Sequence, residues 1–466
     1  MEIRFSCGNC GRKLKADPEA AGQKADCPEC GSLIIIPSPA GADPHLPPAE
    51  QTAWEEGGLA GLPDTTKGRH TCPTCWLKFD SGAIMHISVH ESLKGDPILG
   101  EDVQQRFHAM RFNDSRQALD AMGMVCNEIA CPHCRRRLPI GFIDEPQHIV
   151  SLVGDQSAGK SYYLAVLSKV LPGTLYSQFQ TVMQDADPTG NAALNDLRKT
   201  LFAATSPEQI RVNKTVMEGA MYERLPRQGR TVALPRPFIY TLGSADHSKP
   251  RSSIIFYDNA GEHFQPGVRL AEQPGALHVV SAAALLFLFD PFNHPDFRRA
   301  MHGCMDPQME KPVLDQQDII LSEMRSRILN VRGLPSNHRM HEQLAVIVGK
   351  LDAWKHLLAG EPLLDPVANG KLDLGAVYHN SSRVRQLLLG ICPSIVANAE
   401  ALSLDVCYFP VSAFGHTPVK VGEGAYAPDP AKLKPFQVEI APLWILSRLC
   451  PQLVPTCGGR TADRPG

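Results

Sequence analysis

The sequence predicts an α/β fold with a mainly parallel β-sheet, preceded by two small cysteine-rich modules. Three observations lead to this prediction. Apolar segments without alternation recur through the C-terminal two thirds of the chain, which is typical of strands that helices cover on both faces. One such segment runs into a glycine-rich loop and a helix-compatible stretch, and four C-x-x-C pairs lie within the first 134 residues.

The length and composition favour several folded units in a reducing compartment. A chain of 466 residues exceeds the usual size of one core, so we expect two or three units. The net charge of −3 provides no global field that would attract nucleic acid or an anionic membrane. The N-terminus lacks a signal-peptide core, and the apolar run from Val279 to Phe289 is too short to span a bilayer. We therefore expect a cytoplasmic protein without a transmembrane segment, whose C-x-x-C pairs bind metal.

Residues 1–36 are predicted to form a zinc ribbon. They contain two C-x-x-C pairs separated by sixteen residues, and the segment is too short to bury a sufficient core unaided. Four thiolates would close a tetrahedral shell, which makes this zinc structural. The segment resembles the short N-terminal zinc ribbons of many multidomain bacterial proteins, planctomycete ones especially. The predicted ligands are Cys7, Cys10, Cys27 and Cys30.

Two segments are predicted to lack stable structure. Residues 37–69 are rich in proline, alanine, glycine and acidic residues and show no apolar period, which is typical of a flexible linker. Residues 454–466 end in CGGRTADRPG and are predicted to be a disordered tail. The first ribbon would therefore be a tethered module, free to dock on a partner or on its own chain.

Residues 70–146 are predicted to form a second zinc-binding module with a helical insertion. Two C-P-x-C knuckles open and close this segment, with fifty-five residues between them. The favoured zinc ligands are Cys72, Cys75, Cys131 and Cys134. His86 and His90 offer an alternative, because with the first knuckle they resemble a two-Cys two-His finger. Their i, i+4 spacing equally suits one polar face of a helix.

The local charge of both modules disfavours nucleic acid as their partner. Residues 1–36 hold five basic and five acidic side chains, and residues 70–146 hold eight and ten. The one basic cluster, residues 135–137, is short enough to be a solvated edge. We therefore expect the modules to dock on protein or to be purely structural.

A phosphate-binding loop joins the predicted strand 149–153 to the predicted helix 161–170. The loop matches G-x-x-x-x-G-K-[ST], in which glycines let backbone N–H groups face phosphate oxygens and the helix adds its dipole. Lys160 would reach the β- and γ-phosphates, and Ser161 would offer a hydroxyl to Mg²⁺. The loop consists of Gly154, Asp155, Gln156, Ser157, Ala158, Gly159, Lys160 and Ser161.

Residues 147–453 read as one α/β domain. A polar, helix-compatible stretch of about seventy residues follows the loop and includes a predicted helix at 191–203. Further strands are predicted at 237–242, 253–257, 284–289, 344–348 and 405–410. The strand 253–257 runs into Asp258, which with Gly261 forms a D-x-x-G segment. Asp258 suits Mg²⁺, and the Gly261 N–H can approach a γ-phosphate because no side chain blocks it.

The phosphate loop, D-x-x-G, G-K-L-D at 349–352 and Ser412-Ala413 resemble, in this order, the G1, G3, G4 and G5 motifs of translation-factor and Ras-like P-loop GTPases. The resemblance covers the motif positions of residues 148–415, and it implies GTP and GDP as ligands. It further implies that Asp352 accepts hydrogen bonds from guanine, that Lys350 packs on the base, and that the Ser412-Ala413 backbone contacts O6. The pairing with zinc ribbons also resembles the bacterial double-GTPase group, proposed to act in conflict systems, which implies a second GTPase as a partner.

The sequence departs from this family pattern at several positions. Gly349 stands where the G4 asparagine or threonine would tie its loop to the phosphate loop. Glu262 stands where Ras-like proteins place the water-orienting glutamine, and its charge opposes the γ-phosphate, so slow hydrolysis is expected. Thr215 and Thr231 are both candidates for the switch I threonine. Arg269 is a candidate arginine finger in name only.

These observations lead to the hypothesis of a regulatory GTPase that binds Mg²⁺-GTP and hydrolyses it to GDP and phosphate, with zinc ribbons as docking modules. Two alternatives remain. One is a nucleotide-gated scaffold with little turnover, and the other is a zinc-ribbon nucleic-acid-binding ATPase. The charge count and the K-x-D motif disfavour the second alternative.

Overall fold

The computed structural model divides the chain into two compact units, Met1–Leu62 and Pro63–Gly466, which are described separately. The structure describes residues 3–6, 12–17, 24–30, 33–35, 69–155, 158–210, 221–227, 230–258, 277–313, 317–358, 360–422 and 425–458. Among the described residues, no helix combines the length and the apolarity that crossing a bilayer requires.

The first unit contains two small antiparallel hairpins. They are formed by β1 (Ile3–Ser6) with β2 (Lys13–Ala16), and by β3 (Lys24–Asp26) with β4 (Leu33–Ile35). Cys27 is buried and Cys30 is exposed, at the end of the second hairpin's first strand. Cys7 and Cys10 lie outside the described residues, as does the predicted linker up to residue 68, so the first zinc site stays a prediction.

The second cysteine-rich module is built from short strands. A four-stranded sheet has the order β10-β7-β13-β14, and hairpins β5-β6, β8-β9 and β11-β12 complete it. The strands are β5 (His70–Thr71), β6 (Lys78–Phe79), β7 (Met85–Ile87), β8 (Lys94–Asp96), β9 (Gly100–Gln104), β10 (Arg106–Phe107), β11 (Ala118–Leu119), β12 (Val125–Cys126), β13 (Ile129–Ala130) and β14 (Arg137–Leu138). The predicted helical insertion is wrong: residues 70–146, all of them described, contain one 3₁₀ helix (η3, Ser81–Ala83) and no α-helix.

A seven-stranded sheet forms the centre of the second unit and confirms the α/β class with a mainly parallel sheet. Its order is β16-β19-β20-β15-β21-β22-β25. The five strands from β20 to β25 run parallel, whereas β19 is antiparallel to both of its neighbours. The strands are β15 (Gln147–Gly154), β16 (Thr181–Asp185), β19 (Pro237–Ser244), β20 (Ser252–Asp258), β21 (Ala284–Phe289), β22 (Gln343–Val348) and β25 (Val406–Pro410).

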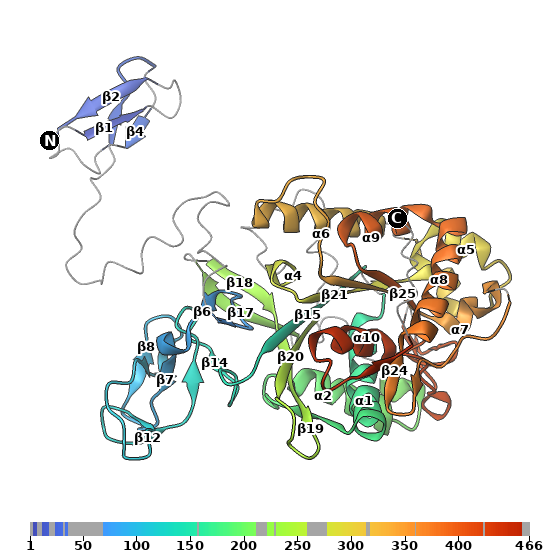
Figure 1. Cartoon of the computed structure of the whole chain (residues 1–466). Helices are drawn as coiled ribbons and strands as arrows, with labels where there is room; N and C mark the ends of the chain where they lie inside the picture. Colours follow the sequence, from blue (N-terminus) through green and yellow to red (C-terminus); the bar gives the residue numbers. More distant parts are fainter. Residues whose placement is uncertain are drawn as a thin grey trace. The chain divides into compact units, whose positions relative to one another are not determined.

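Helices cover both faces of the sheet, as the non-alternating strands predict. β20, β21 and β22 are buried along their whole length. α6 and α9 lie on one face of the sheet, and α1, α2 and α10 lie on the other (Figure 1). Their buried side chains belong to two separate hydrophobic clusters. The helices are α1 (Lys160–Phe179), α2 (Ala192–Ala203), α4 (Leu277–Val280), α5 (Pro295–Ala300), α6 (Gln317–Arg332), α7 (Leu351–Trp354), α8 (Leu374–Ile391), α9 (Pro393–Leu402) and α10 (Ile440–Leu449).

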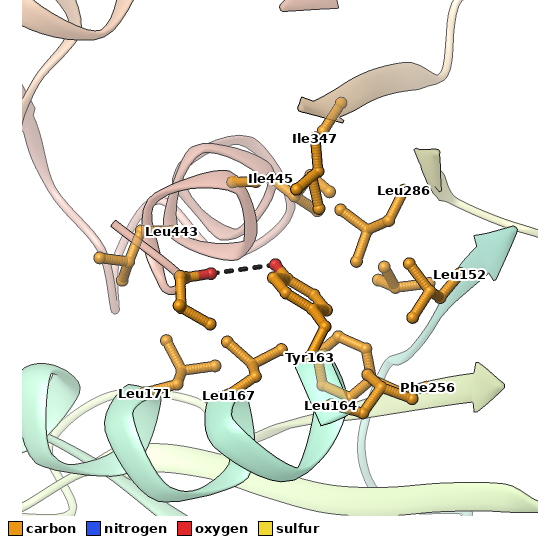
Figure 2. Packing of buried hydrophobic residues seen from close by; sticks show 14 of the residues in the cluster. Leu152, Tyr163, Leu164, Leu167, Leu171, Phe256, Leu286, Ile347, Leu443 and Ile445 are labelled. Atoms are coloured by element: carbon orange, nitrogen blue, oxygen red, sulfur yellow. Dashed lines mark hydrogen bonds between the residues drawn. The ribbon is translucent and has the colours of Figure 1, made fainter. Parts of the chain in front are cut away.

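The layer beneath α1 fixes the helix that follows the phosphate loop. Tyr163 of α1 lies among Leu152, Phe256 and Leu286 of the sheet, and its hydroxyl donates a hydrogen bond of 2.9 Å to the Val438 carbonyl (Figure 2). Burial of such large apolar side chains contributes about 1.5 to 3 kcal/mol each. The start of α1 is therefore anchored in the core.

The remaining elements lie around the sheet. They are the hairpin β17 (Tyr222–Arg227) with β18 (Arg230–Pro235), the hairpin β26 (Val419–Lys420) with β27 (Tyr426–Ala427), the strands β23 (Val367–Ala368), β24 (Lys371–Asp373) and β28 (Thr456–Cys457), and the 3₁₀ helices η4 (Pro207–Ile210), η7 (Pro291–Asn293), η8 (Pro307–Glu310), η9 (Lys355–Leu357) and η10 (Pro430–Lys432).

Two sequence predictions need correction here. The polar stretch after the phosphate loop contains the strand β16 as well as α2, although it was expected to be helical. The predicted disordered tail begins too early, because β28 pairs in parallel with β24 and Val454 is buried. Residues 459–466 lie outside the described residues.

Candidate nucleotide site and cysteine centre

Two glycines give the phosphate loop its shape. Gly154 ends β15 opposite Leu288 of β21, and a Cβ at this position would lie 2.5 Å from the Leu288 carbonyl oxygen. Gly159 caps the N-terminus of α1 with φ of 91°, in the left-handed region that favours glycine. The motif therefore has glycine where the backbone requires it. Gln156 and Ser157 lie outside the described residues, and the loop residue Ala158 is buried.

Lys160 lies inside this loop. Its Nζ donates hydrogen bonds to the carbonyl oxygens of Gly154, at 2.9 Å, and Asp155, at 2.7 Å. The side chain is only 8% exposed. The cation is thus held at the N-terminus of α1, where the helix dipole also favours an anion.

Ser161 and Asp258 bring two hard oxygen groups together beside the loop. Asp258 ends β20, and the Ser161 hydroxyl donates a hydrogen bond to its Oδ2. Burial raises the pKa of Asp258, although the Lys160 charge and the Ser161 hydroxyl act in the opposite direction. A hydroxyl and a carboxylate are ligand types that Mg²⁺ prefers, so this pair fits the ion.

The remaining residues that were predicted at the phosphate end are not placed at the loop by the described part of the chain. Gly261, Glu262, Arg269 and Thr215 lie outside the described residues, and Thr231 falls within β18.

The predicted base-recognition residues come together after β22 and β25. Lys350 adopts φ of 57° and precedes α7, and its Nζ lies 2.6 Å from Asp290 Oδ2. Asp352 accepts a hydrogen bond from the Ser412 hydroxyl, which in turn accepts one of 2.8 Å from the Gly415 N–H. The G4 and G5 segments are therefore joined through side chains.

A cavity of about 140 Å³ connects the phosphate loop with these segments. It is lined by Ala158 and Gly159 from the loop and by Lys350, Asp352, Ser412 and Ala413 from the other two segments. Aromatic side chains complete the wall: Tyr162, Phe414 and Tyr426. The structure thus gathers residues more than 250 positions apart around one hollow lined by polar and aromatic side chains.

Two residues at this site were not predicted from the sequence. Asp290 directly follows β21 and pairs with Lys350. Asn293 lies three residues later, and its Nδ2 donates a hydrogen bond of 3.1 Å to Oδ2 of the loop residue Asp155. The same signal that singled out Asp258, an acid directly after an apolar strand, was available for Asp290.

The two knuckles of the second module form one centre of four sulfurs. The Sγ atoms lie 3.7 Å apart for Cys72 and Cys134 and 3.8 Å apart for Cys75 and Cys131, and all four lie within 4.8 Å of one another. Zn–S bonds of about 2.3 Å place the sulfurs of a tetrahedron about 3.8 Å apart. The cluster therefore fits zinc, and the predicted partnership of the two knuckles is confirmed.

The two knuckles have the same backbone conformation and the same N–H to sulfur hydrogen bond. The N–H of Thr74 donates to Cys72 Sγ, and the N–H of His133 donates to Cys131 Sγ, both at 3.4 Å. The residue after each second cysteine, Trp76 or Arg135, has positive φ. Main-chain N–H groups directed at sulfur stabilise thiolates, which is the form that binds a metal.

The histidine alternative is wrong. His86 lies in the strand β7, and neither it nor His90 belongs to the cysteine cluster, which is the one group with metal-binding geometry among the described residues. His90 Nδ1 instead lies 2.7 Å from the Ser92 hydroxyl. Cys126 is buried outside the cluster.

Comparison with known proteins gives one relative in sequence. No family model matches the chain. A protein of Mycolicibacterium smegmatis, described as "Putative ESX-1 scaffolding and assembly protein SaeC", is 25% identical over 310 residues, which span 62% of this chain and 72% of the relative.

Solved structures with matching regions include GTPase-like proteins. Sup35 complexed with GDP is 13% identical with a TM-score of 0.20, over 58% of this chain and 38% of its own. The GTP-bound Ski7 GTPase-like domain of S. cerevisiae is 12% identical with a TM-score of 0.24, and the match covers 58% of this chain and 43% of that one. A chain of the SRb-GTP/SRX complex of Chaetomium thermophilum is 11% identical with a TM-score of 0.23, and the match covers 57% of this chain and 91% of that one. At these scores the matches carry no argument, and the α/β class rests on the strand order.

Proposed function

We propose that this chain is a guanine-nucleotide-binding protein that hydrolyses GTP to GDP and phosphate. The observation that carries the proposal is the shared cavity. Three segments that lie far apart along the chain, the phosphate loop, G-K-L-D and Ser412-Ala413, line one hollow. A phosphate cradle and a carboxylate facing the same space suit the two ends of one nucleotide.

At the phosphate end, the proposal gives each polar group one task. Lys160 contacts the β- and γ-phosphates, in place of the carbonyl oxygens that its Nζ meets in this structure. Ser161 and Asp258 hold Mg²⁺, which neutralises charge on the phosphates. Glu262 orients the attacking water, and the Gly261 N–H meets the γ-phosphate. Repulsion between the Glu262 carboxylate and the phosphate makes intrinsic turnover slow.

At the base end, the Asp352 carboxylate selects guanine. It accepts hydrogen bonds from guanine N1 and N2, whereas adenine would present an acceptor to it. The Ser412 hydroxyl orients this carboxylate, since it donates to Asp352. The Lys350 stem covers one face of the base, and the Ala413 backbone contacts O6.

The zinc modules are proposed to dock on protein partners in the cytoplasm, among them a second GTPase. A nucleotide-gated scaffold with little turnover is the second candidate function. It is favoured by the sequence relative, whose description names scaffolding and assembly. The two candidates share the nucleotide site and differ in hydrolysis alone.

Two measurements on the full chain test the proposal. Titration of a fluorescent GDP analogue in Mg²⁺ should give saturable binding that Lys160→Ala removes. Phosphate release from GTP, compared between the parent and Glu262→Gln, separates the candidates. Turnover that depends on Glu262 supports the GTPase, tight binding without turnover supports the scaffold, and no binding by the parent refutes both.

A further inference from the structure

We propose that the turn formed by Asp290 to Asn293 replaces the missing G4 asparagine and locks the base-recognition loop to the phosphate loop. The inference rests on the proposed function and assigns positioning roles to Asp290 and Asn293. It starts from Gly349, which has no side chain to make that connection.

The turn reaches the base-recognition loop through Asp290. Its Oδ2 lies 2.6 Å from Lys350 Nζ, in an ion pair whose carboxylate is 2% exposed. Gln317 of α6 fixes the backbone of Asp290 from both sides, accepting from its N–H at 2.7 Å and donating to its carbonyl at 3.0 Å. A buried carboxylate with a rigid backbone sets the position of the Lys350 ammonium.

The turn reaches the phosphate loop through Asn293. Its Nδ2 donates to Asp155 Oδ2 at 3.1 Å, and both side chains are buried. Two hydrogen bonds of 3.0 Å hold the turn itself, from the Phe292 N–H to Asp290 Oδ1 and from the Asn293 N–H to the Asp290 carbonyl. One carboxylate thus serves both ends: Oδ1 closes the turn that carries Asn293, and Oδ2 pairs with Lys350.

The backbone of Gly349 is firmly placed, so only its side-chain connection is absent. Its N–H donates to the Phe289 carbonyl at 3.0 Å, and its carbonyl accepts from Trp354 Nε1 at 2.7 Å. A Cβ at Gly349 would lie 3.4 Å from Leu288 Cδ1 and 3.5 Å from the Phe289 oxygen, which are ordinary contacts. An asparagine can therefore be introduced here without displacing the strand.

This arrangement links the two ends of the nucleotide. Asp155 belongs to the loop that would cradle the phosphates, and Lys350 and Asp352 would flank the base. A rigid connection between them holds both halves of the cavity at one spacing, which reduces the ordering cost of binding. Loss of the connection should therefore weaken GTP binding and also lower the preference for GTP over ATP.

The test compares Asp290→Asn and Asn293→Ala with the parent by competition of GTP and ATP against labelled GDP. Both variants should lose GTP affinity by about tenfold and lower the GTP/ATP ratio, since hydrogen bonds to charged groups contribute about 1.5 to 3 kcal/mol. Glu323→Gln is the matched control, because it removes the ion pair with Arg327 within α6, away from the turn. It should bind like the parent.

Rescue distinguishes positioning from a merely structural role. Gly349→Asn, placed in the Asn293→Ala background, should recover at least about threefold in GTP affinity. The same change in the Lys160→Ala background should recover none. The inference would be overturned if both turn variants kept the GTP affinity and the GTP-over-ATP preference of the parent. It would also be overturned if Gly349→Asn gave no rescue. Absence of guanine-nucleotide binding by the parent would instead refute the proposed function.

Discussion

The Tyr257 hydroxyl donates a hydrogen bond to the carbonyl of Pro73, which follows the first residue of the four-cysteine cluster. Tyr257 is buried and directly precedes Asp258. Its ring stacks on the His278 ring, with 4.9 Å between the ring centroids. It also contacts the ring of Trp76, the residue after Cys75, with 6.1 Å between the centroids. The cysteine centre therefore packs directly behind the strand end that presents the proposed magnesium ligand.

Tyr257→Phe should weaken Mg²⁺-dependent nucleotide binding and lower the melting temperature. The change keeps the ring and leaves the buried Pro73 carbonyl without its donor, at a cost of about 1 to 3 kcal/mol. Tyr240→Phe is the matched control, because the buried Tyr240 hydroxyl has no hydrogen-bond partner among the described residues. Thermal unfolding and nucleotide titration in Mg²⁺ check both variants. Equal behaviour of the two variants would show that the knuckle does not support β20.

Zinc should be present at two ions per chain, one in each cysteine-rich module. Elemental analysis of the parent and of a Cys72→Ser, Cys75→Ser variant measures this, and the variant should retain one ion. The variant removes two of the four clustered cysteines and with them the metal that would join the two knuckles, so the melting temperature of the second unit should fall. A folded, reduced parent without zinc would contradict the prediction for both modules.

Lys160→Ala should abolish nucleotide binding while the fold survives. The substitution removes the cation that the loop surrounds, whereas the apolar contacts of α1 beneath the sheet are unchanged. Circular dichroism should match the parent, and GTP titration should show no saturation up to millimolar concentration. Affinity equal to that of the parent would mean that the nucleotide binds elsewhere.

Glu400→Gln should lower stability at neutral pH but less so in acid. The Arg385 guanidinium, with Nε 2.5 Å from the carboxylate, holds the pKa of Glu400 below its ordinary value of 4.5. A depressed pKa contributes stability that is present above pH 4.5 and is lost as the pH falls through the folded-state pKa. The parent and variant should therefore converge in free energy of unfolding below pH 4.5.

Urea unfolding between pH 3.5 and 7 checks this prediction, with Glu310→Gln as the control. Glu310 pairs with Lys420 on the surface, where both side chains are more than half exposed, so the control should differ little from the parent at any pH. A constant difference between Glu400→Gln and the parent across the range would contradict the assigned role of the ion pair.

The sequence predicted six of the seven strands of the sheet, because each of these six contains a largely buried, non-alternating run. It predicted less about strand direction, since β19 is largely buried like the parallel strands of the sheet, although it runs antiparallel to both β16 and β20. β16 was missed because most of its side chains are partly exposed and several are polar, like those of the surrounding loops. The insertion at 70–146 was misjudged because its two- to five-residue strands are too short to show a period.

The candidate site was likewise predictable from the sequence only in part. Motif spacing singled out Lys160, Asp258 and Asp352 as candidates, because the chemistry proposed for each follows from its position after a strand. The Asp290 to Asn293 turn could not be assigned a role from spacing, since its function depends on the distances to Lys350 and Asp155 in the folded chain. Gly349 marked the place where a substitute connection was needed without indicating its source.

The most direct test of guanine recognition is competition of GTP, ATP and XTP against a labelled guanine nucleotide, with the parent and Asp352→Asn compared. The amide replaces an acceptor that guanine N1 and N2 need, so GTP affinity should fall at least about tenfold. XTP should recover part of the loss, because its N1–H and C2 carbonyl match the amide. We expect the parent to prefer GTP over ATP, and we expect Asp352→Asn to shift this preference toward XTP. Equal displacement by ATP and GTP in the parent would contradict guanine recognition by Asp352.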